Sequence, residues 1–560
     1  MSEPTMPDPE AAALFEIVRQ RYGDRLTPSL MDEARKIVRA QLEAGRALRA
    51  MRLTNADEPM QPFAPYREEP PLTVSALASP LEPSVSARTS ALSPEGRGGC
   101  AVIFTPVREL AALVRAREVS PVELAELFLD RLERLGPKYN AVVTVMRDHA
   151  LSQARRAEGE IAAGGYRGPL HGIPYGAKDL LATAGAPTTW GAAPYKEQRF
   201  DFDAAVIHKL EEAGAVLVAK LAMIELAGGM GYRQPTASFT GPCVNPWDAN
   251  AWTGGSSSGS GAAVAGGLVP FAIGSETWGS ILSPAGYCGL TGLRPTYGRV
   301  SRHGAMALCW TLDKLGPLAQ TADDCGLVLD AIAGPDPRDP TASDRPYRYD
   351  AAGRKGFRFG VIANVTDGCE DAVAENFTRS LGVLRKLGTV EEITLPDMPY
   401  EQITRTILQV EAAGAFEDLI ESGGIAGLTA PEDRTTPYAR DAILAKDYLK
   451  AMRLRGVMAR EIDRVLGSFD ALVAPGRINE APVLGQEFRS AIRATAKDVM
   501  GAIGNGAGLP ALCVPNGFGV RGLPTSIQFM GRAWEENTIL AAGRAYQSLT
   551  EWHTRHPKLG

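Results

Sequence analysis

Two glycine-rich turns of this 560-residue chain carry serines in a setting that suits nucleophilic chemistry. The first turn is residues 254–261, with the sequence GGSSSGSG, and the second is residues 274–280, with the sequence GSETWGS. Glycine at this density marks places where the backbone adopts positive φ or approaches another group closely. The apolar run at 262–273 between the turns has the length of a short helix. We therefore expect the turns to bring two serine hydroxyls face to face, as in a serine-based active site.

Other roles for the first turn fit the residues less well. A flexible linker would not be followed at once by an apolar run, and a phosphate-binding loop needs a lysine, which is missing between Lys220 and Lys314. Residues 255–259 match the nucleophile-elbow pattern around Ser257, but that pattern requires a preceding strand. Residues 248–253 do not have the pattern of a strand, so we interpret this match as coincidental. A purely structural glycine-rich turn remains the alternative to an active site.

The base that would activate a serine is predicted to be a lysine. A serine hydroxyl is a poor nucleophile until a base removes its proton. None of the histidines stands in a catalytic pattern; they are at positions 149, 171, 208, 303, 553 and 556. A lysine can serve instead if burial lowers its pKa so that the amine is neutral. Lys178 follows the small and apolar residues GIPYGA and ends a predicted buried strand. Most lysines are solvated, so Lys178 is a candidate only in combination with the serines.

Taken together, these segments resemble the amidase signature family of Ser–Ser–Lys hydrolases. The resemblance covers about residues 105 to 557 and is carried by blocks such as HGIPYGAKDLLATAGAPTTWGA, NPWDANAWTGGSSSGS and GSETWGSILSPAGYCGLTGLRPTYGRVS. It implies that Ser280 is the acyl-accepting nucleophile, that Ser256 is the cis-serine bridging nucleophile and base, and that Lys178 is the base. It also implies an oxyanion hole made of the main-chain N–H groups of Thr277, Trp278, Gly279 and Ser280.

Three positions around the second turn depart from the pattern D-x-G-G-S-x-R that is usual in the family. Glu276 keeps the negative charge of the aspartate. Trp278 replaces a glycine, and we expect its indole to form a wall of the substrate pocket, with core packing as the alternative. Leu282 replaces the arginine and removes a cation close to the site. The substrate is therefore predicted to be neutral, and hydrophobic or aromatic.

Further substrate-binding residues follow from the resemblance. Gly228, Gly229 and Met230 lie at the positions where members of this family line the acyl pocket. In the region before residue 500, Ile407, Phe416 and Tyr438 are further pocket candidates, although core packing is the favoured role for them.

The elements that must position these residues predict a single α/β domain of the amidase-signature type. Strand-like and helix-like segments alternate, and the apolar strands are nearly continuous, which favours a large mixed central β-sheet flanked by helices. We assign residues 105–560 to this catalytic domain, with a helix-rich insert at about 340–500. Residues 1–65 are predicted to be an N-terminal helical arm of two helices, the second capped by Thr27. Residues 66–104, rich in Pro, Ser and Ala, are predicted to be a linker.

Composition excludes several other classes. A net charge of −6 gives no electrostatic reason to bind nucleic acid. The seven cysteines contain no C-x-x-C pair, which favours reduced thiols and a cytoplasmic protein over disulfides or zinc. Residues 1–20 lack a signal-peptide core, and no apolar run is long enough to span a membrane. We expect no metal or other cofactor, no membrane partner and a small-molecule amide substrate; a homodimer is compatible with these observations.

Three functions compete at this stage. The leading one is an amidohydrolase that cleaves a linear carboxamide, with ester or carbamate cleavage as a further activity. The second is the glutaminase subunit of a tRNA-dependent amidotransferase, against which the fused arm and Leu282 argue. The third is a catalytically inactive binding protein, which the presence of Lys178, Ser256 and Ser280 disfavours.

Overall fold

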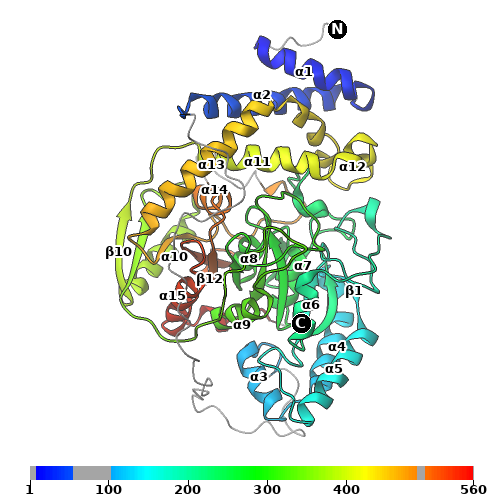
Figure 1. Cartoon of the computed structure of the whole chain (residues 1–560), viewed down its shortest axis with the longest axis vertical. Helices are drawn as coiled ribbons and strands as arrows, with labels where there is room; N and C mark the ends of the chain where they lie inside the picture. The colour runs from blue at the N-terminus through cyan, green and yellow to red at the C-terminus, as the bar shows by residue number, and fades with distance from the viewer. Residues whose placement is uncertain (1–7, 55–101, 489–497, 559–560) are drawn as a thin grey trace.

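The computed structural model describes residues 8–54, 102–488 and 498–558, and these ranges form one mixed α/β architecture (Figure 1). Its centre is an 11-stranded sheet with the strand order β1-β3-β2-β6-β8-β7-β12-β13-β11-β9-β10. Parallel and antiparallel pairs occur side by side; β2 runs parallel to both of its neighbours, whereas β6 and β8 are antiparallel. The predicted large mixed sheet flanked by helices is confirmed.

The strands of this sheet are short and mostly buried. They are β1 (Val142–Val145), β2 (Pro174–Lys178), β3 (Val216–Leu221), β6 (Phe271–Glu276), β7 (Thr291–Arg294), β8 (Lys314–Ala319), β9 (Phe357–Ile362), β10 (Gly388–Ile393), β11 (Ala471–Pro475), β12 (Ala511–Phe518) and β13 (Pro524–Met530). Every residue of β2, β3, β6, β7, β8, β11 and β13 is buried. Burial on both faces explains why strands such as β3 and β11 have nearly continuous rather than alternating apolar sequences.

Helices surround the sheet (Figure 1). They are α3 (Val107–Arg115), α4 (Pro121–Tyr139), α5 (Arg147–Ala162), α6 (Ala205–Glu212), α7 (Ser258–Ala265), α8 (Leu282–Cys288), α9 (Ala322–Ile332), α10 (Asp371–Leu384), α11 (Tyr400–Ala415), α12 (Glu417–Glu421), α13 (Ala445–Leu466), α14 (Val499–Gly506) and α15 (Glu536–Ser548). Their starts follow local sequence signals. Ser120 and Glu123, for example, form a capping box at α4, with Pro121 at the first helical position.

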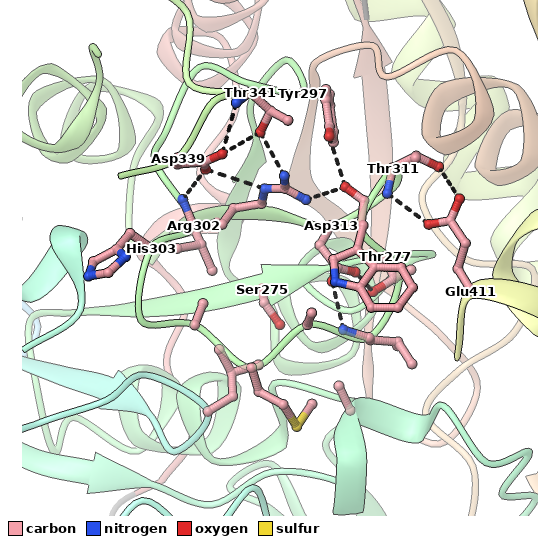
Figure 2. A pocket seen from close by; sticks show the side chains of 18 of the residues that line it. Ser275, Thr277, Tyr297, Arg302, His303, Thr311, Asp313, Asp339, Thr341 and Glu411 are labelled. Atoms are coloured by element: carbon pink, nitrogen blue, oxygen red, sulfur yellow. Dashed lines mark hydrogen bonds and ion pairs between the residues drawn. The ribbon is translucent and has the colours of Figure 1, made fainter. Parts of the chain in front are cut away.

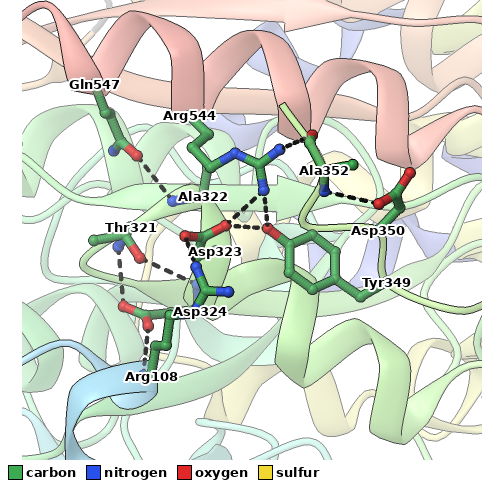
Figure 3. A network of polar contacts seen from close by, with 10 residues as sticks. All are labelled: Arg108, Thr321, Ala322, Asp323, Asp324, Tyr349, Asp350, Ala352, Arg544 and Gln547. Carbon is green, nitrogen blue, oxygen red and sulfur yellow. Dashed lines mark hydrogen bonds and ion pairs between the residues drawn. The ribbon is translucent and has the colours of Figure 1, made fainter. Parts of the chain in front are cut away.

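A polar network fixes three of these helices to one another (Figure 3). Asp323 in the first turn of α9 accepts a hydrogen bond from Arg108 of α3 at 2.7 Å and from Arg544 of α15 at 3.1 Å. The adjacent Asp324 completes a capping box with Thr321. The first and last helices of the catalytic region are thereby held at the same end of α9.

Two helices precede this region, as predicted, and they pack on the far end of the molecule (Figure 1). They are α1 (Pro9–Tyr22) and α2 (Pro28–Ala50), and Thr27 caps the second. The arm contacts α11, α13 and the 3₁₀ segment Thr436–Ala442. The Tyr22 ring packs on Tyr438 with centroids 4.5 Å apart, and Arg49 pairs with the buried Asp447 at 2.8 Å. The arm therefore covers the insert and leaves the sheet to the other helices. Most of the predicted linker, residues 66–101, lies outside the described residues.

The insert differs from a purely helical addition. Residues 340–500 do contain α10 to α13, but they also supply β9, β10 and β11 to the sheet. The insert thus belongs to the same core as the rest of the catalytic region. One local prediction is wrong: Asp248–Trp252 forms a strand, β5, which pairs with β4 (Val244–Asn245) in a separate two-stranded sheet. Polar and apolar residues do not alternate along β5, because this strand belongs to a two-stranded hairpin outside the main sheet.

Candidate active site

Lys178 is placed at the buried end of β2, between β3 and β6. Its side chain is fully buried, and Nζ lies 2.8 Å from Oγ of Ser256 and 2.9 Å from Oγ of Ser275. Burial lowers its pKa to about 7, while the charges of Asp313 and Glu276 oppose this shift. Lys178 is therefore an amine that can be neutral near pH 7, with hydroxyl groups as its partners.

Ser256 follows the glycine pair of the first turn, and the Gly255–Ser256 peptide bond is cis, as the resemblance implies. The main-chain carbonyl of Ser256 accepts a hydrogen bond from the N–H of Ile224 at 3.1 Å. The next residue, Ser257, donates its N–H to the carbonyl of Ser280 at 3.3 Å. This hydrogen bond joins the two glycine-rich turns directly. The turns therefore lie side by side, as the prediction of two facing serine hydroxyls requires.

The second turn is shaped by Glu276 at the end of β6. Its buried carboxylate accepts the N–H groups of Ile281 at 2.9 Å and Leu282 at 3.0 Å, and pairs with Arg294 at 2.8 Å. Although burial opposes ionisation, Arg294 and Lys314 lower the pKa of Glu276 to about 2. The carboxylate thus pulls the start of α8 back toward the strand and leaves residues 277–280 as a tight turn.

This turn presents main-chain donors beside Ser280. Gly279 has φ +85°, a conformation that favours glycine. Among the main-chain hydrogen bonds of the described turns and loops, none has the N–H group of Trp278, Gly279 or Ser280 as its donor. Ser280 itself is 8% exposed. The Thr277 hydroxyl donates to Asp313 at 2.5 Å, which fixes the first residue of the turn.

Trp278 lies partly at the surface, with polar and cationic contacts. Its Nε1 donates to the carboxylate of Asp498 at 2.7 Å, and the Arg405 guanidinium lies 5.1 Å from the ring centroid. Asp498 also caps α14 by accepting the N–H of Gly501. The indole therefore connects the turn at residues 277–280 to Arg405 of α11 and to Asp498, the cap of α14.

Ser257, at the centre of the elbow-like match, has a structural role in this geometry. A strand, β5, and a helix, α7, do flank it, so the strand expected of an elbow is present. Its hydroxyl, however, donates to the carbonyl of Ser275 at 3.2 Å and accepts the N–H of the same residue at 3.3 Å. Ser257 ties the first turn to β6, and its hydroxyl has no histidine partner among the described residues.

Ser275 is the site residue that sequence reasoning missed. It is the fifth residue of β6 and lies one strand away from Lys178, since β2 and β6 are parallel neighbours. The only sequence signal was a serine near the end of an otherwise apolar strand, FAIGSE. Such a polar residue needs a partner when it is buried, and here the partner is the catalytic candidate Lys178.

A cavity of about 1080 Å³ reaches this cluster at Ser275 and Thr277. Figure 2 shows Arg302, Asp339 and Thr341 on one side of it and Glu411 on the other. Most of its polar lining groups already have partners: Arg302 contacts Asp339 at 3.6 Å, and Glu411 accepts from the main chain of Thr311 at 2.9 Å. The cavity has a mixed lining, in which apolar residues such as Leu180, Met306 and Leu308 accompany the polar ones, and it meets the Lys178 cluster at Ser275.

The predicted pocket residues occupy several places. Ala227 lines the cavity, but its neighbours Gly228, Gly229 and Met230 are not among the lining residues, and neither are Trp278 and Leu282. Met230 and Leu282 are buried in the main hydrophobic core. The insert candidates Ile407, Phe416 and Tyr438 are core residues too, in line with the favoured role. Their assignment as substrate contacts stays a prediction.

The other expectations from composition concern groups outside the site. The described residues hold no cluster of His, Cys, Asp and Glu that could bind a metal ion. Six cysteines are free and buried, and Cys100 is outside the described ranges. Among the described helices, none has the length and apolar character needed to cross a bilayer.

The α/β fold places the buried Lys178 against a serine of each glycine-rich turn. Comparison with known proteins identifies the chain as an amide-hydrolysing enzyme. The family model described as Amidase matches residues 123–540, and the chain belongs to this family. It is 35% identical over 485 residues to a glutamyl-tRNA(Gln) amidotransferase subunit from Carboxydothermus hydrogenoformans, covering 81% of this chain and 99% of that protein.

Solved structures lead to the same family. The peptide amidase of Stenotrophomonas maltophilia has a TM-score of 0.69 and 29% identity, covering 80% of this chain and 97% of that chain. A bacterial aryl acylamidase of the amidase signature family has a TM-score of 0.70 and 25% identity, covering 80% of this chain and 98% of that one. The part of the chain left uncovered is about the length of the arm and the predicted linker.

Proposed function

We propose that this protein hydrolyses linear carboxamides through an acyl-enzyme on Ser280, with Lys178 as the base and Ser256 as the proton relay. The observation that carries the proposal is the position of Lys178. It is fully buried, with Nζ 2.8 Å from the Ser256 hydroxyl. A charged lysine in such a place would normally have a carboxylate partner, so a neutral amine is the state that fits.

The first half of the reaction forms the acyl-enzyme. Neutral Lys178 takes the proton of Ser256, and Ser256 takes the proton of Ser280 as the Ser280 oxygen attacks the amide carbon. The main-chain N–H groups of residues 277–280 stabilise the tetrahedral oxyanion, each contributing roughly 3 kcal/mol. Ser256 then gives a proton to the leaving nitrogen, so that an amine or ammonia departs instead of a strongly basic anion.

The second half releases the acid. Water loses a proton through the same relay, attacks the ester carbon of acylated Ser280, and the Ser280 oxygen leaves with a proton returned from Ser256. An ester or a carbamate would follow the same path with an easier leaving group.

The glutaminase subunit is the second candidate, because glutamyl-tRNA(Gln) amidotransferase subunits are close in sequence to this chain. Support for a stand-alone hydrolase comes from the arm, which packs in cis over α11 and α13 and covers a face of the insert. The prediction of a neutral, hydrophobic or aryl substrate depends on the replacement of an arginine by Leu282. The thiol content supports a cytoplasmic setting, and a homodimer remains compatible with it.

The test is covalent labelling of the purified chain with a fluorophosphonate, followed by intact mass and peptide mapping. A single adduct on Ser280, absent from Ser280→Ala, is expected. An adduct on Ser257 would place the nucleophile at the elbow-like turn instead, and absence of any adduct would favour a protein without serine chemistry.

Activity of the chain alone separates the two candidate functions. Anilides, aliphatic amides, L-glutamine, esters and carbamates are incubated with the purified protein, and release of ammonia, amine or alcohol is measured. A stand-alone amidase should turn over at least one amide without partners. Glutamine as the sole substrate, with turnover that depends on added partner proteins, would favour the glutaminase.

A further inference from the structure

A guanidinium group that the mechanism above does not use lies beside the oxyanion turn. Arg477 comes two residues after β11, in the segment PGRINEAP. A Cβ placed on Gly279 would lie 3.7 Å from Nη1 of Arg477, and a Cβ placed on Gly286 would lie 3.3 Å from its Cγ. The guanidinium carbon is 5.4 Å from the centroid of the Tyr287 ring. The side chain therefore runs along α8, with its charged end next to the residue that precedes Ser280.

This cation has no acidic partner among the described residues. Its Nε is buried and makes no hydrogen bond there. The other cations near the turn are engaged: Arg294 pairs with Glu276 at 2.8 Å, and Arg405 lies over Trp278. A buried guanidinium N–H group without an acceptor costs free energy unless a ligand or water supplies one.

The carboxylate that acts most on Arg477 is that of Asp498, and it is committed elsewhere. Its two oxygens accept from Nε1 of Trp278 at 2.7 Å and from the N–H of Gly501 at 2.9 Å. Burial disfavours the charge on Arg477, but Tyr287 and Asp498 more than offset this, so its pKa is raised above the usual arginine value. Arg477 thus stays a cation at every working pH.

The position of Arg477 is defined by rigid elements. Its backbone follows a fully buried strand, and its aliphatic part contacts α8 at a glycine, where a side chain would displace it. A site on strands and helices holds a charge in place more accurately than a surface loop does. The guanidinium is therefore preorganised to meet a group that sits at Gly279 during catalysis.

We propose that Arg477 binds a carboxylate of the substrate, so that the preferred substrates are linear amides carrying a free carboxylate a few bonds from the scissile amide. A guanidinium edge offers two parallel N–H donors that match a carboxylate and favour it over a neutral carbonyl. The inference rests on the proposed function, because it takes Gly279 and Ser280 as the reaction centre. It departs from the neutral substrate that Leu282 predicted, because Arg477, in the segment after β11, supplies a cation where Leu282 of α8 does not.

The test compares monoamides of dicarboxylic acids with the corresponding diamides. Malonamate, succinamate and glutaramate each present the same amide as malonamide, succinamide and glutaramide, but with a carboxylate at the other end. At one chain length the wild type should have kcat/KM at least about tenfold higher for the monoamide, because a site that binds an ionised group rejects the analogue lacking it. Arg477→Gln should reduce this preference by roughly 10- to 100-fold, the range for hydrogen bonds to a charged group.

A matched control removes an arginine charge at the surface. Arg348 is 89% exposed and pairs with Asp330 at 3.2 Å. Arg348→Gln should leave the monoamide preference unchanged, and Arg477→Lys should restore part of it. A wild type that prefers the diamides at every length, or an equal fall for both substrate types in Arg477→Gln, would overturn the inference.

Equilibrium binding keeps this test separate from the proposed function. Binding of malonate, succinate and glutarate to the Ser280→Ala protein is measured by calorimetry, with and without Arg477→Gln. Weaker binding of one diacid by about tenfold or more is expected when Arg477 is replaced. If the fluorophosphonate does not label Ser280 but diacid binding still depends on Arg477, only the proposed reaction is refuted. If Ser280 is labelled but diacid binding does not depend on Arg477, only the carboxylate site is refuted.

Discussion

Two buried lysines on neighbouring strands of the sheet show what separates a catalytic base from a structural cation. Lys178 on β2 and Lys220 on β3 are both fully buried. Nζ of Lys220 lies 2.9 Å from Oδ1 of Asp179, whereas Nζ of Lys178 contacts the hydroxyls of Ser256 and Ser275. Burial lowers both pKa values, but at Lys220 the adjacent carboxylate opposes it through charge and hydrogen bonding. Lys178 therefore differs from Lys220 in having hydroxyl groups instead of a carboxylate as its direct partners, which is the arrangement that the proposed base requires.

The largest effects are expected when each lysine is replaced by the apolar isostere methionine. Lys178→Met should lower kcat by about 1000-fold or more, because no other base adjoins Ser256. Its melting temperature should change little, since methionine avoids the cost of burying an amine. Lys220→Met leaves Asp179 buried without its cation, which should destabilise the fold by about 3 to 5 kcal/mol, while kcat per folded molecule stays near the wild-type value.

Kinetics on folded protein and thermal unfolding of both variants check this contrast. If Lys178→Met retained substantial turnover, another group would have to be the base. If both variants lost activity and stability together, the two lysines would share a structural role and the comparison would fail.

The candidate site residues are assigned through the resemblance to the amidase signature family, and local sequence signals support that assignment. Lys178 ends a strand whose apolar sequence is read directly, and Ser256 and Ser280 each follow glycines that fix a turn. The helix start at Thr27 and Pro28 is another local signal that was sufficient.

The missed features depend on contacts between distant segments. Ser275 meets Lys178 only because β6 is placed beside β2, and no local pattern defines that neighbour. Arg477 follows β11, which is five strands away from β6 in the sheet, yet its side chain lies beside Gly279. A sequence argument based on Leu282 alone therefore did not take the charge of Arg477 into account. β5 was missed because an edge hairpin with polar residues lacks the alternation that marks a half-buried strand.

The pH dependence of turnover sharpens the comparison with a moderate effect. With the pKa of Lys178 at about 7, the neutral amine is lost as the pH falls through this value. Activity should therefore decline about tenfold for each pH unit well below the midpoint and level off above it. A profile of kcat/KM for one neutral amide measures this. Lys314, whose pKa is also about 7, donates to Asn505 and not to a site hydroxyl, so Lys314→Met should keep the midpoint. A flat profile would mean that Lys178 is not the titrating base.

The smallest effect concerns the second hydroxyl that holds Lys178. Nζ donates to the Ser275 hydroxyl at 2.9 Å, so a neutral amine held there would keep its one lone pair for the Ser256 proton. Ser275→Ala should lower kcat by about 3- to 10-fold with little change in KM, the range expected for loss of one neutral hydrogen bond. Ser260 provides the matched control, because it is also buried and donates to the Ile273 carbonyl on the same strand at 3.2 Å. Ser260→Ala should keep kcat near wild type. Equal losses in both variants would assign Ser275 to packing of β6, whereas a loss as large as that of Lys178→Met would make it part of the proton relay itself.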